Sequence, residues 1–241
     1  MFAIFQKEIN SFFNSPIAYI VISIFLVAMG LFSWIFPNNI LESGFASLDA
    51  LFWISPFVYM FLIPAITMRT FAEEKQTGTI ELLFTNPISD WYIVISKYLA
   101  SWILVLFSLV PTLFYYYSVY DLGNPQGNID SAAVAGSYIG LLLLGGVFVA
   151  IGIFASAITN SQISSFVVAV FLCFILYTGF SSLSNINIWN EYAYFIGKIG
   201  IDFHYEALSK GLIDSRNVLY FFSITAIFLY LTKLVLQSRK W

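Results

Sequence analysis

The sequence predicts an all-α, polytopic membrane protein with six transmembrane helices. The first observation is composition: of 241 residues, 60% are hydrophobic and only 10% are charged. So little charge cannot surround a buried core with a charged shell, as a water-soluble domain requires. The second is that the apolar residues form runs long enough to cross a hydrocarbon layer of about 30 Å as helices. The third is the abundance of rings, 26 Phe and 15 Tyr, which is typical of lipid-facing and headgroup-level positions.

Six apolar runs of about 18 to 23 residues each are candidate spans. The first run is longer than the apolar segment of a signal peptide, has Lys7 and Glu8 before it and lacks a small-residue cleavage site, so we expect it to be retained. We find no internal repeat and no soluble domain, and expect one transmembrane domain over 1–241. The predicted spans are 17–36, 51–68, 97–117, 136–158, 163–183 and 218–236.

The residues before the first span predict a short interfacial helix that ends near Pro16. Its apolar side chains recur at helical spacing, with polar residues opposite, which favours a position at the inner membrane interface. The alternative is a disordered N-terminus, because short isolated helices fray. The apolar positions are Phe2, Phe5, Ile9, Phe12 and Phe13.

The distribution of Lys and Arg predicts that both termini face the cytoplasm. With the N-terminus inside, seven of the ten cations lie on the inner side and three on the outer side. This agrees with the rule that cytoplasmic loops carry an excess of Lys and Arg. The inner cations are Lys7, Arg69, Lys75, Lys97, Lys233, Arg239 and Lys240, and the outer ones are Lys198, Lys210 and Arg216.

The segment 69–90 interrupts the apolar pattern and would lie on the cytoplasmic side. Thr70 and Glu73 have capping-box spacing, which predicts a short helix from about Phe71 that Gly78 ends. Thr79 would cap a second turn over 80–85, ended by Pro87, and Ser89 would cap the helix that leads into the third span. The alternative is a solvated loop with ordinary charges.

Small residues and prolines mark the helices that we expect to pack or bend. Gly136, Gly140 and Gly146 give the fourth span faces that admit a close neighbour, either within the chain or across a subunit seam. Prolines within spans free backbone carbonyls, so they indicate hinges or static bends. These prolines are Pro56, Pro64 and Pro111.

The loop 184–217 is too long for a simple turn and predicts short helices at the outer face. One is aromatic-rich, and a second, from Asp202, would end at Gly211. The residues on the apolar face of the first are Ile188, Trp189, Tyr192, Phe195, Ile196 and Ile199.

Several kinds of chemistry are missing from the sequence. No ionisable residue lies in the middle of a predicted span, and we expect Lys97 and Lys233 to snorkel from span ends, which disfavours ion-coupled transport. There is no phosphate-binding loop, because Gly197 and Lys198 are followed by Ile199, so the chain cannot hydrolyse ATP alone. Cys173 is the only cysteine, which excludes a thiol-rich metal site.

An intramembrane hydrolase is a weaker interpretation. Ser181 follows Gly179 near the end of the fifth span, and His204 is the only histidine. A general base must reach the nucleophile, and His204 falls in the outer loop, where we expect a solvated histidine and a loop-capping serine instead. No catalytic residue, bound cofactor or metal is therefore assigned to this chain, and no nucleic-acid partner.

The charged segment carries a family resemblance. Residues 73–83, which read EEKQTGTIELL, followed by NPIS at 86–89, resemble the cytoplasmic loop of type-2 ABC exporter permeases, which pairs acidic residues with a G-T-x-E-L-L pattern and a P-x-S. Residues 7–16 resemble the entry helix of that family, and 204–220 resemble its outer loop. The chain is most similar to the gliding-motility-associated permease subunits of bacterial inner membranes.

This resemblance implies a coupling helix over about 71–81 that enters a cleft of a separate ATPase subunit carrying ATP and Mg. It also implies a second permease copy or an auxiliary membrane subunit with a large outer domain, surrounded by membrane lipid. A membrane anchor or mechanical coupler that moves no solute is the alternative from another class. The residues assigned to the ATPase contact are Glu73, Glu74, Lys75, Thr77, Gly78, Thr79 and Glu81.

Overall fold

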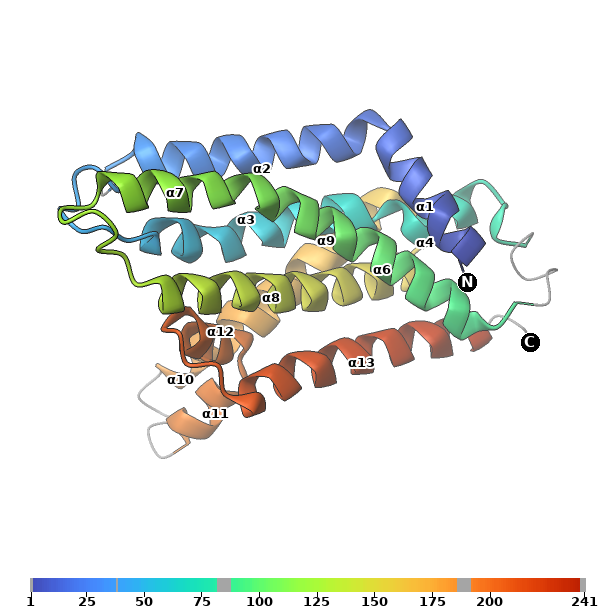
Figure 1. Ribbon diagram of the computed structural model, residues 1–241. Coiled ribbons are helices and arrows are strands. Elements are labelled where there is room, and N and C mark those ends of the chain that lie inside the picture. The colour runs from blue at the N-terminus through green and yellow to red at the C-terminus, as the bar shows by residue number, and fades with distance from the viewer. Residues whose placement is uncertain (1, 38, 82–87, 186–191, 239–241) are drawn as a thin grey trace.

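The computed structural model describes residues 2–37, 39–81, 88–185 and 192–238 of the chain (Figure 1), and within these ranges it is all helical, without a strand. The helices are α1 (Phe2–Asn14), α2 (Pro16–Trp34), α3 (Asp49–Thr67), α4 (Arg69–Gln76), α6 (Asp90–Leu109), the 3₁₀ turn η1 (Val110–Thr112), α7 (Leu113–Leu122), α8 (Ser131–Ile158), α9 (Gln162–Phe174), the π-helical turn η2 (Ile175–Gly179), α10 (Phe180–Ser184), α11 (Ala193–Ile199), α12 (Ile201–Ser209) and α13 (Ser215–Ser238).

Six helical segments within the described residues are long and apolar enough to cross a membrane, which confirms the predicted fold class. Several extend beyond the apolar runs, because a helix continues through polar residues once its backbone hydrogen bonds are formed. The third begins at Asp90 rather than near 97, and the second runs on through α4. The segments are Pro16–Trp34, Asp49–Gln76, Asp90–Leu122, Ser131–Ile158, Gln162–Ser184 and Ser215–Ser238.

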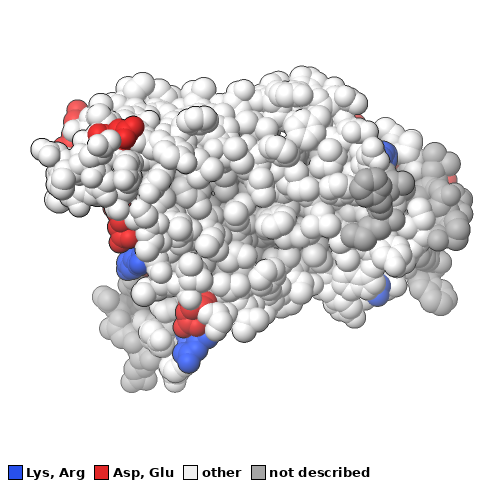
Figure 2. All heavy atoms as spheres, in the orientation of Figure 1, with Lys and Arg blue, Asp and Glu red and all other residues white. Residues whose placement is uncertain are grey.

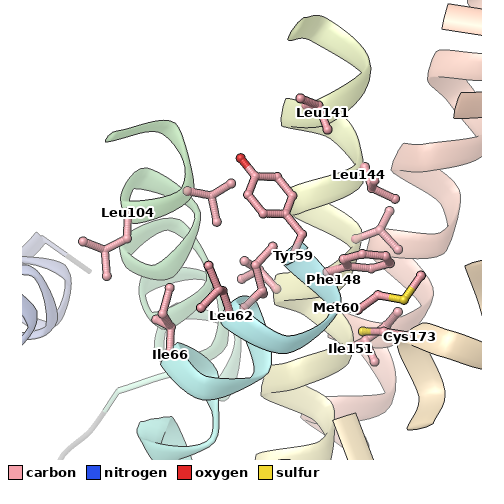
Figure 3. Packing of buried hydrophobic residues seen from close by; sticks show 14 of the residues in the cluster. Tyr59, Met60, Leu62, Ile66, Leu104, Leu141, Leu144, Phe148, Ile151 and Cys173 are labelled. Atoms are coloured by element: carbon pink, nitrogen blue, oxygen red, sulfur yellow. The ribbon is translucent and has the colours of Figure 1, made fainter. Parts of the chain in front are cut away.

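Helix α8 is the centre of the molecule (Figure 1). It packs against α3, α6, α9, α12 and α13, and most of its length is buried. Figure 3 shows side chains of α3, among them Tyr59 and Met60, lying against Leu144 and Phe148 of α8, with Cys173 of α9 beside them. The core is therefore built from several spans packed around one helix.

Small residues allow the close approaches to α8. A Cβ on Gly136 would lie 2.9 Å from the Cα of Gly211, at the C-terminal end of α12, and one on Gly140 would lie 3.3 Å from the Tyr205 ring. A Cβ on Gly146 would lie 2.8 Å from the Tyr98 hydroxyl of α6. All three glycines thus face other helices of the same chain.

The three prolines of the predicted spans occupy two kinds of position. Pro56 and Pro64 lie inside α3 and are both buried, whereas Pro111 lies in the 3₁₀ turn between α6 and α7. A proline cannot donate a backbone hydrogen bond, so the tighter turn after α6 is the expected local response.

The two ends of the molecule differ in content (Figure 1). Helices α1 and α4 and the end of α13 lie at one end, while α10, α11 and α12 lie at the other. On the face drawn in Figure 2, the charged side chains lie toward these two ends and the middle carries none. This separation suits an apolar belt with two polar caps.

Two predicted short segments form as helices. The interfacial helix is α1, and Ser15 caps the next helix, its Oγ accepting from Ile17 N at 3.4 Å. In the loop 184–217, α11 and α12 form, and Gly211 follows α12 with a φ of 76°. The expected positions Ile188 and Trp189 lie outside the described residues.

Candidate functional site

A buried lysine anchors the charged end of the molecule. Lys97 of α6 is 1% exposed, and its ammonium donates to Glu8 Oε1 at 2.9 Å, Glu74 Oε1 at 2.9 Å and the Thr70 carbonyl at 2.7 Å. An ammonium has three N–H donors, so all of them are used. Its pairing with two carboxylates compensates the cost of burying the charge.

The expectation that Lys97 snorkels to water is wrong. Because α6 begins at Asp90, Lys97 lies about two turns inside the helix. Its side chain meets α1 and α4 there instead of the membrane surface. Ser89 is the N-cap residue of α6, as predicted, although its side chain makes no capping hydrogen bond, and the apolar run from 97 marks only the later part of this helix.

Lys7 completes what we call the ion cluster, formed by Lys7, Glu8, Glu74 and Lys97. The Lys7 ammonium lies 3.2 Å from Glu74 Oε1 and 3.7 Å from Glu8 Oε1. Partial burial acts to lower the pKa of Lys7, but Glu74 and Glu8 outweigh it and raise that pKa above its ordinary value. The cluster ties together α1, α4 and α6.

A cavity of about 240 Å³ lies beside the ion cluster and is lined by α1, α4 and the ends of neighbouring helices. Its wall includes Arg69, which pairs with Glu73 one turn along α4, Nε to Oε2 at 2.7 Å and a second nitrogen to Oε1 at 2.8 Å. Two parallel bonds hold both side chains in one plane. Glu73 therefore stabilises α4 itself.

Helix α4 is also attached to α8. The Ser156 hydroxyl of α8 accepts from Phe71 N at 3.0 Å and Ala72 N at 2.9 Å, and it donates to the Met68 carbonyl at 3.0 Å. Lys75 donates to the carbonyls of Ala157 and Thr159 at the C-terminal end of α8. A cation at that end satisfies free carbonyls and complements the helix dipole.

The predicted capping box at Thr70 does not form. Thr70 Oγ1 donates to the Thr67 carbonyl at 2.7 Å, and the helix begins at Arg69 after Met68, without a side-chain cap. Met68 itself has helical φ and ψ, so α4 follows α3 almost without interruption. A threonine hydroxyl inside such a helix bonds back to an earlier carbonyl rather than capping a new one.

Beyond α4 the chain forms what we call the exposed turn, Thr77 to Glu81. Gly78 has a φ of 72°, which ends the helix, as predicted. Thr77 Oγ1 lies 2.9 Å from Thr79 Oγ1, and Thr77, Gly78, Thr79 and Glu81 are all exposed. The expected second short helix and the residues Leu82, Leu83, Asn86 and Pro87 lie largely or wholly outside the described residues.

The seven residues assigned to the partner contact therefore divide into two groups. Glu74 and Lys75 bind groups of α1, α6 and α8, and Glu73 pairs within α4. The other four lie in the exposed turn. A charge concentration by itself could not separate these groups, because the partners of Glu74 and Lys75 lie far away in the sequence.

The Ser181 and His204 side chains do not pair. Ser181 Oγ donates to Asp202 Oδ2 at 3.0 Å. His204 is 6% exposed, its ring nitrogens lie 2.7 Å from Asn217 Oδ1 and 2.9 Å from the Lys198 carbonyl, and its ring stacks on Tyr220. The expectation of a solvated histidine is wrong, because α11 and the first turns of α13 enclose the ring.

The comparisons with known proteins agree with this arrangement. A family model described as ABC-2 family transporter protein matches residues 2–240, nearly the whole chain. In the comparison with curated proteins, no sequence matches. The six apolar helices among the described residues agree with a multi-pass membrane protein. The chain therefore belongs to the ABC-2 transporter family, whose multi-pass membrane subunits work with a separate ABC ATPase.

Proposed function

We propose that this chain is the permease subunit of an ATP-driven exporter, in which the exposed turn receives the motion of the partner ATPase. One observation carries the proposal: the turn is exposed, but the helix beneath it is fixed on several sides. A loose loop would absorb a push, whereas a helix held by packed neighbours passes it on.

The contacts of α4 define where a displacement of the turn would go. Glu74 connects α4 to α6 and α1 through Lys97, so a displacement of α4 would move both of these helices. Ser156 and Lys75 connect it to the end of α8, the central helix. Movement at one small surface would thus reach the spans on both sides of α4 and the core.

The partners follow from the resemblance and the family. ATP and Mg would be bound by the ATPase, and a second copy of this chain or a related permease would complete the translocation unit. We place the α1–α4 end in the cytoplasm of a bacterial inner membrane, because the inner segments carry most of the Lys and Arg. The likeness of residues 73–89 to gliding-motility-associated permeases supports a role in motility or protein secretion, with an auxiliary subunit at the outer face.

The test is capture of the ATPase by a tagged chain in mild detergent, with Glu81→Lys as the variant. Glu81 is exposed and lies at the end of the exposed turn. We expect the recovered nucleotide-binding subunit to fall at least about fivefold, the effect of losing one energetically important interface residue. Recovery is quantified by mass spectrometry of the subunit that carries a phosphate-binding loop.

Glu42→Lys is the matched control, because Glu42 is exposed in the loop between α2 and α3 at the opposite end. It should leave recovery unchanged. Equal recovery of the ATPase with wild-type chain and Glu81→Lys, at equal yield and the same elution volume, would contradict the proposed contact.

A further inference from the structure

A second polar cavity lies at the end opposite the ion cluster, between α3, η2 and α12. Its volume is about 590 Å³, large enough for a small organic molecule. Nothing in the coupling role uses this cavity, and none of its lining residues belongs to α1 or α4. We therefore consider this cavity as a binding site for a ligand, separate from the contact with the ATPase.

One wall of the cavity is an unbroken series of aromatic rings. Trp53 and Phe57 of α3 have ring centroids 5.6 Å apart, Phe57 and Tyr177 of η2 are 5.9 Å apart, and Tyr177 and Tyr205 of α12 are 6.3 Å apart. Tyr177 and Tyr205 are each 4% exposed, so packing holds their rings in place, while Trp53 is 69% exposed. The faces of such rings attract cations.

The other lining groups give the cavity a negative charge. Asp49, Asp202 and Glu206 contribute three carboxylates against one ammonium, that of Lys210, which lies 2.7 Å from Glu206 Oε1. Asp202 is partly buried and accepts from Ser181 Oγ at 3.0 Å. Burial raises the pKa of the Asp202 carboxyl, and the nearby Glu206 carboxylate raises it further, while the hydrogen bond from Ser181 lowers it. A bound cation would stabilise the ionised form of Asp202.

The spacing of these carboxylates distinguishes between kinds of cation. Across the described residues, no three His, Cys, Asp or Glu side chains lie close enough together to hold a metal ion. Rings and separated carboxylates suit a larger, weakly hydrated cation, whose charge is spread over alkyl groups that contact the ring faces.

We propose that this cavity binds an organic cation with an alkylated ammonium group, held between the Trp53 to Tyr205 ring series and the Asp202 and Glu206 carboxylates. The exposed Trp53 lies at the mouth. It also lines a neighbouring apolar groove of about 710 Å³ that includes Phe32 and Phe45, so a ligand with an apolar substituent has a surface for it. The cation is either a free solute or the headgroup of a membrane lipid.

The experiment is calorimetric titration of the purified chain in nanodiscs of phosphatidylglycerol, which has no ammonium headgroup. The probes are choline and 3,3-dimethylbutanol, its neutral isostere. We expect choline to bind at least about fivefold more tightly, within the range of a cation–π contact plus an ion pair. Equal affinities, or no binding of choline, would overturn the proposal.

Variants test the two parts of the site separately. Glu206→Gln and Asp202→Asn should each weaken choline binding at least about threefold. The affinity for 3,3-dimethylbutanol should stay unchanged. Trp53→Leu should reduce the preference for choline over the isostere. Glu206 is exposed, so its variant avoids the folding risk of Asp202→Asn. Glu42→Gln and Phe114→Leu are controls, because both residues are exposed and neither lines the cavity or the neighbouring groove. An equal loss in these controls would also overturn the assignment.

A second nanodisc composition identifies the source of the cation. In discs that contain phosphatidylcholine, weaker binding of soluble choline would identify a lipid headgroup as the occupant, and unchanged binding would identify a free solute. Both results support the cation site. No ATPase is present in this experiment, so an absence of choline binding would not contradict the proposed coupling contact. Equally, a failure to capture the ATPase would not contradict the cation site.

Discussion

At the scale of single residues, Lys97 determines how the charged end is built. Its three donors meet three acceptors from α1 and α4, and its ammonium lies 5.0 Å from the Phe71 ring centroid. A buried pair adds little net stability compared with an apolar replacement of both partners, but removal of one partner leaves buried charge uncompensated. The role of Lys97 is thus to fix the position of α4 relative to α1 and α6.

Lys97→Met should lower the free energy of unfolding by about 3 to 5 kcal/mol, because the Glu8 and Glu74 carboxylates lose their cation. The measurement is thermal unfolding of the purified chain in detergent. Adding Glu8→Gln and Glu74→Gln should restore part of the loss, since the buried carboxylates are then replaced by neutral amides and the remaining cation, Lys7, has a largely exposed side chain.

The control for Lys97→Met is Lys233→Met. Lys233 of α13 is only partly buried, and its ammonium lies 5.1 Å from the Trp91 ring centroid. It should cost about 1 kcal/mol or less. If both lysine variants unfold alike, the ion cluster does not hold the helices together.

The residue scale also shows what a sequence cannot reveal. Glu74 and Lys75 stand in an exposed-looking charged run, but their partners are 23 and 84 positions away, at Lys97 and Thr159. No local spacing encodes such contacts. By contrast, the left-handed conformation of Gly78 was predictable, because a glycine just after a helical stretch commonly ends the helix in this conformation.

At the scale of elements, the contact between α3 and α8 depends on one absent side chain. A Cβ on Gly152 of α8 would overlap the Thr67 hydroxyl and lie 2.9 Å from Thr67 Cβ. Thr67 is fully buried at the last position of α3, so it has little room to move. The junction between α3 and α4 is therefore positioned by the surface of α8.

Gly152→Ala should destabilise the chain by about 1 to 3 kcal/mol, the cost of overpacking a closely packed contact. Gly179→Ala is the matched control, because its Cβ would meet nothing nearer than Ile175 Cγ2, at 3.5 Å. Thermal unfolding of the two variants compares them directly. A loss in Gly179→Ala as large as that in Gly152→Ala would contradict the packing argument.

Element boundaries were harder to predict than the elements themselves. The change from apolar to charged residues near 69 suggested a new capped helix, but α4 follows α3 with only Met68 between them. A helix is defined by its backbone bonds, and a neighbour such as Ser156 can support polar positions as well as apolar ones. By contrast, the start of α6 was predicted, because Ser89 occupies its N-cap position.

At the scale of the whole molecule, two chemically distinct ends are joined by a packed apolar middle. The sequence predicts this division, because apolar runs and the Lys and Arg distribution extend over the whole chain. The glycines of the fourth span also predicted a close helix neighbour, and in the structure these neighbours belong to the same chain. The aromatic cavity at the far end could not be predicted from the sequence, because its walls come from α3, η2 and α12, which lie far apart in the chain.

The central claim, that the exposed turn meets an ATPase, is tested most directly by a photo-crosslinking amino acid at Thr79, incorporated in cells that express the complete complex. Thr79 is exposed, and the hydrogen bonds of its side chain are local, to Thr77 Oγ1 and the Glu74 carbonyl. We predict an adduct with the nucleotide-binding subunit, identified by mass spectrometry, and none from the same amino acid at Glu42. An adduct from Glu42 but not from Thr79, while the ATPase still copurifies, would contradict the account.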